Sequence, residues 1–478
     1  MYNMWNILGV APKLNRKNMP VTNREYALYS ANSAPHARGQ TSPHPIQPKS
    51  NLIKPNQTKS GQIKPEAPFL AAWFFALLAI CCTSPVLHAA DSFLCASGTV
   101  LKDGHGMGQV VQLRGVNLGG WLEWQDWMCP MDCSKTLRDA NPGHNGYDFE
   151  LRGLLARRFG PTIAESLIGT YEDAWITARD LDNIKALGMN AVRLSIGSDN
   201  FMTEDGSWRV NAFDRIDWLV KTAWDRGIYT IIDYHAFLPA AANQDGSTTG
   251  YWSNAAQRDQ TAQVWTRIAM HFRGNPSVAM YDLLNEPNNS APKGQPEPPP
   301  AAVCDLYDTL YRAIREVDPD HAIAMEGLWT WETLRDPLEA GYRNVVCSLH
   351  WYHFGEKNVT GNNERTDAGL RAVAQMQSRW HLPCLIGEFN LFGEAEAWTH
   401  AIVAYNQAGL SWTLWSYKNK AAGDNSWGVY TTIPGKAPAI PNLATDSAET
   451  IRAKWKAWIT RDSTFALNPM LGPILRAP

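Results

Sequence analysis

Short apolar runs alternate with amphipathic segments along most of the chain. The runs are rich in branched and aromatic residues, and they begin at Arg114, Asn190, Tyr229, Val278, His321, Val345, Leu382 and Leu410. Between them, apolar residues recur at helical spacing, as in WITARDLDNIKALG, where Thr177 and Asp180 form a capping box and Gly188 ends the helix. The pattern therefore predicts strands that alternate with helices.

This alternation predicts parallel strand pairing with right-handed crossovers. The eight runs match the number of strands in a closed parallel barrel. A doubly wound open sheet would share the rhythm, but no Gly-rich nucleotide-binding loop follows the first strand. Between Phe93 and Arg114, two extended pieces flank the Gly-rich stretch KDGHGMGQ and predict a hairpin. The predicted fold class is α/β, a single (β/α)8 TIM barrel with an N-terminal β-hairpin.

The chain upstream of the barrel differs in composition. Residues 1–68 are rich in Asn, Pro, Ser, Lys and Gln, and they hold too little apolar surface to offset the entropy of ordering, so we expect a disordered extension. Residues 69–90 follow the lysines Lys59 and Lys64. They contain an apolar run from Phe69 to Ile80, the helix breaker Pro85 and small residues at the end. That order predicts a signal peptide or signal anchor. Residues 91–478 form the predicted catalytic domain.

A signal peptide normally begins near the start codon, and this segment is preceded by more than sixty residues. Either translation starts downstream of Met1 and the segment is cleaved, or it stays as a membrane anchor through residues 69–88. Its apolar core is shorter than the roughly 20 residues that a span needs, which favours cleavage. Both alternatives place the domain outside the cytoplasm, either secreted or periplasmic, or anchored to the membrane.

Composition narrows the choice of partners. The 43 basic and 46 acidic side chains of this 478-residue chain leave a net charge of −3, so we expect no nucleic-acid partner. The 21 tryptophans favour a ligand with flat apolar faces, such as a sugar.

Six cysteines follow residue 90 and could pair in 15 ways, with Cys129 and Cys133 the first pair to test. Cys347 and Cys384 lie in apolar strands and are expected to be core thiols.

The ends of the predicted strands carry most of the candidate chemistry. The polar or aromatic residues at these positions are Asn117, Arg193, Asp233, His235, Asn285, Glu286, His350, Tyr352, Glu388 and Trp415. Barrel interiors are packed with branched apolar side chains, so ionisable groups here must face the open mouth, where catalysis takes place in this fold. Closure of the barrel can bring Glu286 and Glu388 together although they are far apart in sequence.

These motifs resemble the cellulase-like glycoside hydrolases of family 5, in clan A, over roughly Val111 to Tyr430. The resemblance rests on LLNEP, LIGEF, VRLSI and HWYHF, which carry the strand-end residues above. The stretches RGVNLGGWL and DAWITARDLDNIKALGMNAVRLSIG are most similar to exo-β-1,3-glucanases. SWTLWSYK, WGVY and YTIIDYHA are equally similar to endo-β-1,4-glucanases. The resemblance implies a β-glucanase, with the glucan exo-1,3-β-glucosidase type favoured and an endo-β-1,4-glucanase as the alternative.

Glycoside hydrolysis explains why two carboxyl groups are needed. One protonates the leaving oxygen, and the other stabilises or attacks the oxocarbenium-like centre, with retention when the two lie about 5 Å apart. We predict Glu286 as acid/base and Glu388 as nucleophile, and the family resemblance supports both roles. Arg193 and Tyr352 are expected to contact Glu388, although an ion pair with Asp233 is the alternative for Arg193.

The remaining predicted site residues bind substrate. Asn285 suits the sugar 2-hydroxyl, and the resemblance implies that His235 and His350 bind other hydroxyls. Trp415 is expected to form the floor under the reacting sugar, with Trp121 and Trp329 as further ligand contacts. The Pro-rich insertion NNSAPKGQPEPPP after Glu286 is expected to form a stiff rim.

Two other function classes remain open. A metal-dependent hydrolase would use Asp233, His235, His350 and His353 as ligands. A non-catalytic carbohydrate-binding barrel is the other, and it usually arises when one catalytic carboxylate is replaced. We predict neither metal nor cofactor, because side chains supply acid, base and nucleophile. The expected partner is a β-glucan or related oligosaccharide, and the expected state is a monomer.

Overall fold

The computed structural model describes residues 93–131, 148–203, 205–236, 251–252, 254–287, 297–355, 358–423 and 427–476. Several predictions fall on residues outside these ranges. They are the disordered extension at 1–68, the signal or anchor segment at 69–90, the pairing of Cys129 with Cys133, and most of the Pro-rich insertion. Those predictions stay untested.

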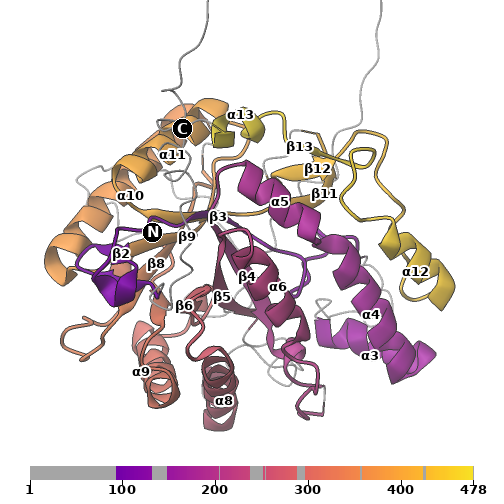
Figure 1. The fold of residues 1–478 in the computed structure, drawn as a ribbon, viewed down its shortest axis with the longest axis horizontal. Helices are drawn as coiled ribbons and strands as arrows, with labels where there is room; N and C mark the ends of the chain where they lie inside the picture. Colours follow the sequence, from indigo (N-terminus) through magenta and orange to yellow (C-terminus); the bar gives the residue numbers. More distant parts are fainter. Residues whose placement is uncertain are drawn as a thin grey trace, which may run out of the picture. The chain divides into compact units, whose positions relative to one another are not determined.

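All eight predicted strands are present, and they close into one parallel barrel (Figure 1). In chain order the barrel strands are β3 (Arg114–Asn117), β4 (Ala191–Gly197), β5 (Tyr229–Ala236), β6 (Val278–Asp282), β7 (Ala322–Glu326), β8 (Val345–Tyr352), β9 (Cys384–Asn390) and β10 (Ser411–Leu414). Closure comes from β10, which pairs with β9 on one side and with β3 on the other. The predicted fold class is confirmed.

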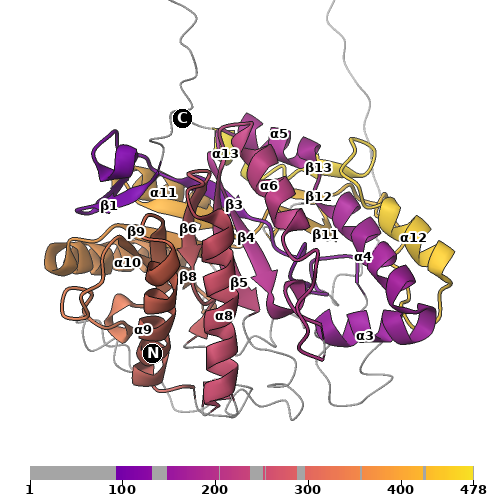
Figure 2. The same ribbon diagram turned by 60° about the horizontal axis from the view of Figure 1, so that its bottom comes forward.

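Helices surround the barrel and cover the outer faces of its strands (Figures 1 and 2). The described helices are α3 (Asp148–Phe159), α4 (Pro161–Trp175), α5 (Ala178–Ala186), α6 (Asp214–Trp224), α8 (Ala255–Phe272), α9 (Pro300–Val317), α10 (Val359–Trp380), α11 (Ala395–Gln407), α12 (Ala448–Lys456) and α13 (Leu471–Arg476). The capping box predicted for α5 is present, since the backbone N–H of Thr177 donates to the Asp180 carboxylate at 2.8 Å. Gly188 follows with φ +77°, a backbone conformation that favours glycine.

The predicted N-terminal hairpin is formed by β1 (Cys95–Ser97) and β2 (Val100–Lys102), which pair antiparallel. Its tight turn contains Gly98, with φ +62°. The Gly-rich stretch forms a second turn, across which Lys102 pairs with Val110. Leu94 and Leu101 pack in one cluster with residues from the first positions of the barrel strands, so the hairpin closes the amino end of the barrel.

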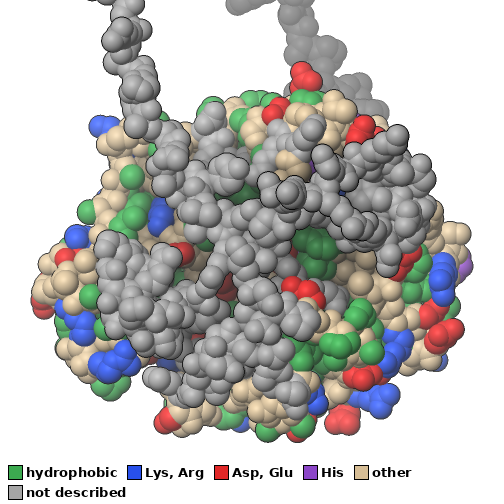
Figure 3. All heavy atoms as spheres, turned by 180° about the vertical axis from the view of Figure 1, so that it is seen from behind, with side chains coloured by type: hydrophobic (Ala, Val, Ile, Leu, Met, Phe, Trp, Pro, Cys, Tyr) green, Lys and Arg blue, Asp and Glu red, His purple; other side chains and the backbone are tan. Residues whose placement is uncertain are grey.

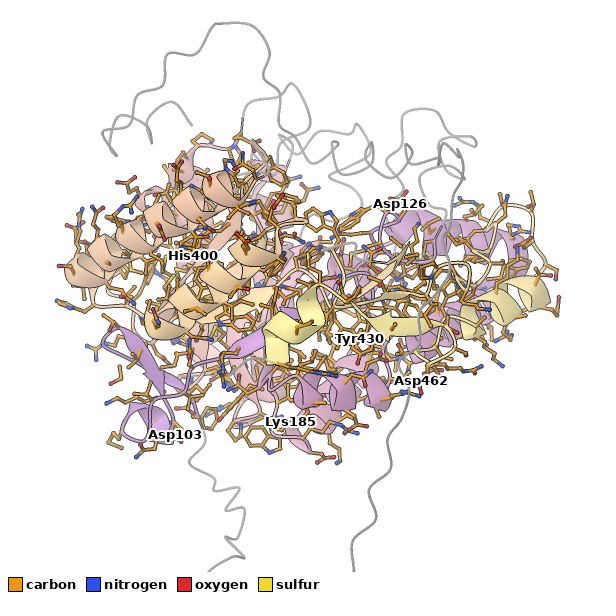
Figure 4. The ribbon with its side chains drawn as sticks, turned by 90° about the horizontal axis from the view of Figure 1, so that it is seen from above. Asp103, Asp126, Lys185, His400, Tyr430 and Asp462 are labelled. Carbon is orange, nitrogen blue, oxygen red and sulfur yellow. The ribbon has the colours of Figure 1, made fainter. Side chains whose placement is uncertain are left out.

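The two ends of the barrel can be located in Figure 4. Asp103, in the loop after β2, and Asp126, in the loop after β3, lie on opposite sides of the domain. Loops that follow the barrel strands therefore gather on the Asp126 side, where the strand-end residues are found. Near the C-terminus, β11 (Lys418–Ala422), β12 (Tyr430–Thr432) and β13 (Phe465–Leu467) form a separate small sheet.

Cys347 and Cys384 are buried and lie opposite each other in β8 and β9, which confirms that they are core thiols.

On the face that Figure 3 shows, basic and acidic side chains are interspersed. Within the described ranges, none of the helices has both the length and the apolar character that crossing a membrane requires.

Candidate active site

Glu388 lies in β9, and both oxygens of its carboxylate are held. Arg193 Nη1 donates to Oε1 at 2.9 Å, and the Tyr352 hydroxyl donates to Oε2 at 2.7 Å. A Cβ on the preceding Gly387 would lie 3.0 Å from His350 Nε2, so glycine at this position lets His350 pack against β9. Glu388 is only 4% exposed. A carboxylate fixed by one cation and one hydroxyl is suited to attack in a single direction.

Arg193 is fully buried in β4, and acceptors surround its guanidinium. The acceptors are Asn117 Oδ1 (3.0 Å), Asp233 Oδ1 (3.0 Å), Asp282 Oδ2 (2.9 Å), Asn285 Oδ1 (3.1 Å) and Glu388 Oε1 (2.9 Å). Burial opposes the charged form, but the surrounding carboxylates raise the pKa of Arg193 above its usual range. The ion pair with Asp233, which the sequence offered as an alternative, therefore coexists with the contact to Glu388.

The two aspartates beside Arg193 differ in electrostatics. Burial raises the pKa of Asp282 to about 6 despite the neighbouring guanidinium. Burial would also raise the pKa of Asp233, but Arg193 and His235 together lower it. Asp233 is thus the firmer anion of the pair, with an ion pair to Arg193 on one side and a hydrogen bond from His235 on the other.

Glu286 lies beyond the end of β6, in a loop rather than in the strand itself. Its backbone has φ +46°, and its N–H donates to Glu326 Oε2 at 2.7 Å. Its carboxylate Oε1 is 3.0 Å from His350 Nδ1. With 15% of its side chain exposed, Glu286 is more accessible than Glu388.

The two glutamates face each other across a short gap. One carboxylate oxygen of Glu286, one of Glu388 and a ring nitrogen of His350 all lie within 4.8 Å of one another. Retaining glycosidases hold their carboxyl groups about 5–5.5 Å apart, and inverting enzymes hold them about 6.5–9.5 Å apart. The approach of these oxygens to within 4.8 Å is on the short side of these ranges, so the geometry suits retention.

His350 lies between the acidic groups. Burial disfavours its charged form, but Glu326, Glu388 and the hydrogen bond to Glu286 raise the pKa of His350 to about 9. These acidic neighbours favour the charged ring, in which Nδ1 donates to Glu286 Oε1. A metal ligand must instead offer a neutral ring nitrogen.

The rival metal site does not assemble from the residues that the sequence suggested. Among the described residues, the set with ligand atoms close enough for one ion is Glu286, His350 and Glu388, without Asp233 or His353. Within this set, His350 Nδ1 is already hydrogen-bonded to Glu286 Oε1 at 3.0 Å.

His235 and Asn285 line the same gap. His235 Nδ1 is 2.8 Å from Asp233 Oδ2, and Nε2 is 3.3 Å from Asn285 Nδ2. Because Arg193 donates to the amide oxygen of Asn285, the NH2 group of that amide must point toward His235. His235 Nδ1 carries the hydrogen that Asp233 receives, and although burial disfavours the charged ring, Asp233 and Glu123 raise the pKa of His235 to about 9. The orientation of both side chains is fixed before any substrate binds.

Trp415 stacks on His235 with ring centroids 5.1 Å apart and 21° between the planes. A Cβ on Gly119 would lie 2.7 Å from the Trp415 ring, so glycine makes room for it. Trp329 packs edge-on to Tyr352, with centroids 6.4 Å apart. Both tryptophans therefore lie beside the catalytic gap, where the sequence placed them.

Trp329 belongs to a larger set of rings, which we call the aromatic wall. It begins at Tyr352, the ring that holds Glu388, and neighbouring centroids are 5.4–6.4 Å apart. Its members are Trp127, Trp329, Tyr352, Phe354, Phe392 and Trp427, from loops or ends of several barrel strands. Apart from Tyr352 the rings are half-buried, so they offer apolar faces next to the gap.

The ligand contact predicted for Trp121 is wrong. Its ring is 0% exposed, packs edge-on to Trp218 of α6, and donates from Nε1 to the backbone oxygen of Glu172 in α4. The side chain after β3 turns outward into the layer between barrel and helices. Trp121 is therefore part of the core that holds α4 and α6 against the barrel.

Sequence reasoning missed several polar residues of the site. Asp282 and Glu326 end β6 and β7, and each interrupts a largely apolar run. Glu123 and Gln125 follow Trp121, and Gln125 Nε2 lies 3.1 Å from Glu123 Oε2 and 3.3 Å from His235 Nε2. A check of every polar residue within each run, and not only of those at its end, would have found Asp282 and Glu326.

Comparison with known families gives a match to the family described as Cellulase (glycosyl hydrolase family 5), over residues 144–421. This range contains both glutamates and every barrel strand from β4 to β10.

The curated relatives have low sequence identity to this chain. A protein named Beta-xylosidase from Phanerodontia chrysosporium is 26% identical over 365 residues, which are 69% of this chain and 71% of that protein. A protein named Probable glucan 1,3-beta-glucosidase A from Aspergillus niger is 25% identical over 289 residues, which are 58% of this chain and 64% of that protein. A solved structure of endogalactoceramidase superposes with a TM-score of 0.51 at 20% identity, and covers 69% of this chain and 75% of that one, which shows a shared fold.

Proposed function

The chain belongs to glycoside hydrolase family 5, the cellulase family, and from that premise we propose that it is a retaining β-glucanase of the glucan exo-1,3-β-glucosidase type. The observation that carries the mechanism is the separation of at most 4.8 Å between oxygens of Glu286 and Glu388. A single anomeric centre fits between two carboxyl groups at this distance.

The proposed reaction is a double displacement. Glu388 attacks the anomeric carbon, the glycosidic C–O bond breaks, and Glu286 gives its proton to the leaving oxygen. This first step leaves a glycosyl ester on Glu388. Glu286, now a carboxylate, takes a proton from a water molecule as that water attacks the same carbon and releases Glu388. Two inversions give net retention.

The surrounding residues serve these two steps. Arg193 and Tyr352 orient the Glu388 carboxylate through the contacts at 2.9 and 2.7 Å. Asn285 and His235, both locked by hydrogen bonds, are placed to bind hydroxyls of the reacting sugar. Trp415 offers a ring face next to His235 for the apolar face of the sugar.

The choice of β-1,3-glucan rests on similarity. The opening RGVNLGGWL resembles exo-β-1,3-glucanases, and several curated relatives carry a glucan 1,3-beta-glucosidase name. The β-xylosidase name of another relative makes xylosides the necessary comparison.

Substrate choice is tested by offering laminarin, lichenan, carboxymethylcellulose, mannan and 4-nitrophenyl β-xyloside in parallel, with product sizes recorded over time. Release of glucose alone from laminarin is the expected result. Early oligomers of intermediate length from carboxymethylcellulose would instead establish an endo-β-1,4-glucanase. A higher kcat/KM on the xyloside than on the matching glucoside would overturn the glucan assignment.

The location outside the cytoplasm is also a proposal, and it rests on the composition of residues 69–90. N-terminal sequencing of the protein recovered from the culture medium or periplasm tests it. A mature chain that begins near residue 91 is expected.

A further inference from the structure

Glu326 is a buried glutamate beside the catalytic pair. It is the last residue of β7 and is 0% exposed. Oε2 accepts the backbone N–H of Glu286 at 2.7 Å, and Oε1 lies 3.3 Å from His350 Nδ1. Its own backbone is fixed by Tyr307, whose hydroxyl both accepts the Glu326 N–H at 3.0 Å and donates to the Glu326 carbonyl at 3.1 Å.

The backbone of Glu286 needs such a partner. Its φ of +46° lies in the left-handed region, which L-residues other than Asn and Asp seldom adopt. A conformation of this kind persists only where the surroundings over-determine it. The hydrogen bond to Glu326 Oε2 ties the amide of Glu286 directly to the end of the neighbouring strand.

The side chains of Glu286 and Glu326 both lie close to one ring nitrogen of His350. His350 Nδ1 lies 3.0 Å from Glu286 Oε1 and 3.3 Å from Glu326 Oε1. Glu326 therefore holds the Glu286 amide directly by a hydrogen bond, and it acts on the Glu286 carboxyl group by attracting the His350 ring that is hydrogen-bonded to it.

We infer that Glu326 is a positioning residue for the acid/base Glu286: its carboxylate holds the Glu286 backbone in the left-handed conformation and orients the Glu286 carboxyl group through His350. The inference rests on the proposed function, because it assumes that Glu286 is the acid/base. It deepens that function by naming the group that aims the proton at the leaving oxygen.

Electrostatics gives Glu326 a second effect on the same proton. The charged and titratable groups that face Glu326 are Glu286 after β6, Asp282 in β6, His350 in β8, Arg193 in β4 and Tyr307 in α9. Burial and the nearby carboxylates raise the pKa of Glu326 well above its usual range, against the opposing charges of His350 and Arg193. Two carboxyl groups in such a site do not readily ionise together, so the pair retains one proton to higher pH than Glu286 would alone.

The experiment compares Glu326→Leu and Glu326→Gln on two substrates, phenyl and 2,4-dinitrophenyl β-D-glucopyranoside. Phenol is a poor leaving group and needs the acid, whereas 2,4-dinitrophenolate leaves without it. In Glu326→Leu, kcat/KM for the phenyl glucoside is expected to fall about 100-fold, the lower range for loss of acid catalysis. For the dinitrophenyl glucoside we expect a fall of less than about tenfold, since proton transfer contributes little there.

Glu326→Gln separates the hydrogen bond that positions Glu286 from the negative charge of the Glu326 carboxylate. Its amide oxygen can still accept the Glu286 N–H, so the loss on the phenyl glucoside should be smaller than in Glu326→Leu. Because the like charge is gone, the alkaline limb of the pH profile of kcat/KM should move to lower pH. The matched control is Glu172→Gln, which removes a buried carboxylate that pairs with Arg152 and Arg215, away from the site, and should leave both rates unchanged.

The outcomes distinguish the two claims. Equal losses on both glucosides, or a Glu326→Gln pH profile that superposes on that of the wild type, would overturn the inference and leave the proposed function intact. Wild-type rates on the phenyl glucoside in Glu286→Ala would overturn the proposed function itself, as would a wild-type enzyme that cleaves neither glucoside. If Glu326→Leu fails to fold, the pH profile of Glu326→Gln still decides.

Discussion

Arg193 Nη1 lies 2.9 Å from Glu388 Oε1, and both side chains are almost closed to solvent. The same guanidinium also meets Asp233 and Asp282. One cation therefore balances the carboxylate proposed as nucleophile and two structural carboxylates at once. Stability and catalysis are linked at this residue.

Arg193→Lys is expected to lower both the stability of the fold and the catalytic rate. The planar guanidinium of arginine contacts five acceptors at once, and the smaller ammonium group of lysine cannot. Some of the buried carboxylates would therefore lose their positively charged partner. Breaking a buried pair typically costs about 3–5 kcal/mol. We expect urea unfolding to show a loss of this size, together with a lower kcat. An unfolding free energy within about 0.5 kcal/mol of wild type would contradict the role of Arg193 as the central counter-ion.

Glu286→Ala separates the two steps of the proposed reaction. Cleavage of an unactivated glucoside should fall about 10²- to 10⁴-fold, because protonation of the leaving oxygen is lost. A 2,4-dinitrophenyl glucoside still forms the glycosyl ester, and added azide should restore turnover by attacking it. The product to measure by NMR is the β-glycosyl azide. Absence of azide rescue, or an α-glycosyl azide, would argue against Glu286 as acid/base in a retaining reaction.

His350 makes stability depend on pH. Its pKa is raised from an ordinary 6.5 to about 9 in the folded protein, so the folded state binds more protons than the unfolded state between these values. The stability that this histidine contributes is complete below pH 6.5 and is lost as pH rises through about 9. We expect the free energy of unfolding to decline across this window by an amount on the order of 1–3 kcal/mol, and to decline less in His350→Gln. Parallel curves for the two proteins would refute the shift.

Trp415 and Trp121 form a matched pair for testing the sugar platform. Trp415→Phe reduces the ring face beside His235, so kcat/KM for glucosides should drop about threefold to tenfold. Trp121→Phe leaves the Glu172 carbonyl without its donor and should cost about 1–3 kcal/mol of stability with unchanged kinetics. Michaelis kinetics and urea unfolding of both variants check this. A kinetic defect in Trp121→Phe without a loss of stability would instead indicate that Trp121 contacts the ligand.

The order of strands and most of the site could be predicted because barrel topology fixes where each strand ends. Apolar runs locate the strands, and polar residues near the carboxyl end of a run must face the open mouth, which is how Arg193, Glu286 and Glu388 were found. Cys347 and Cys384 were placed in the core by the same logic.

The errors and omissions have equally physical causes. Trp121 follows a strand as Trp415 does, but the direction of its ring depends on space between α4 and α6, which no local pattern encodes. Glu326 sits inside the run HAIAMEGL and looks like a single polar interruption of an apolar strand. Only the neighbouring strand, with Glu286 and His350, gives that carboxylate its partners.

The central claim is that Glu388 becomes covalently bonded to the sugar opposite Glu286. The most direct test is incubation with 2,4-dinitrophenyl 2-deoxy-2-fluoro-β-D-glucopyranoside, followed by proteolysis and mass spectrometry of the labelled peptide. The account predicts one fluoroglucosyl group per chain, attached to Glu388 in the peptide that contains LIGEF. A label on any other residue, or active enzyme that turns over glucosides with inversion and never accumulates the ester, would contradict it.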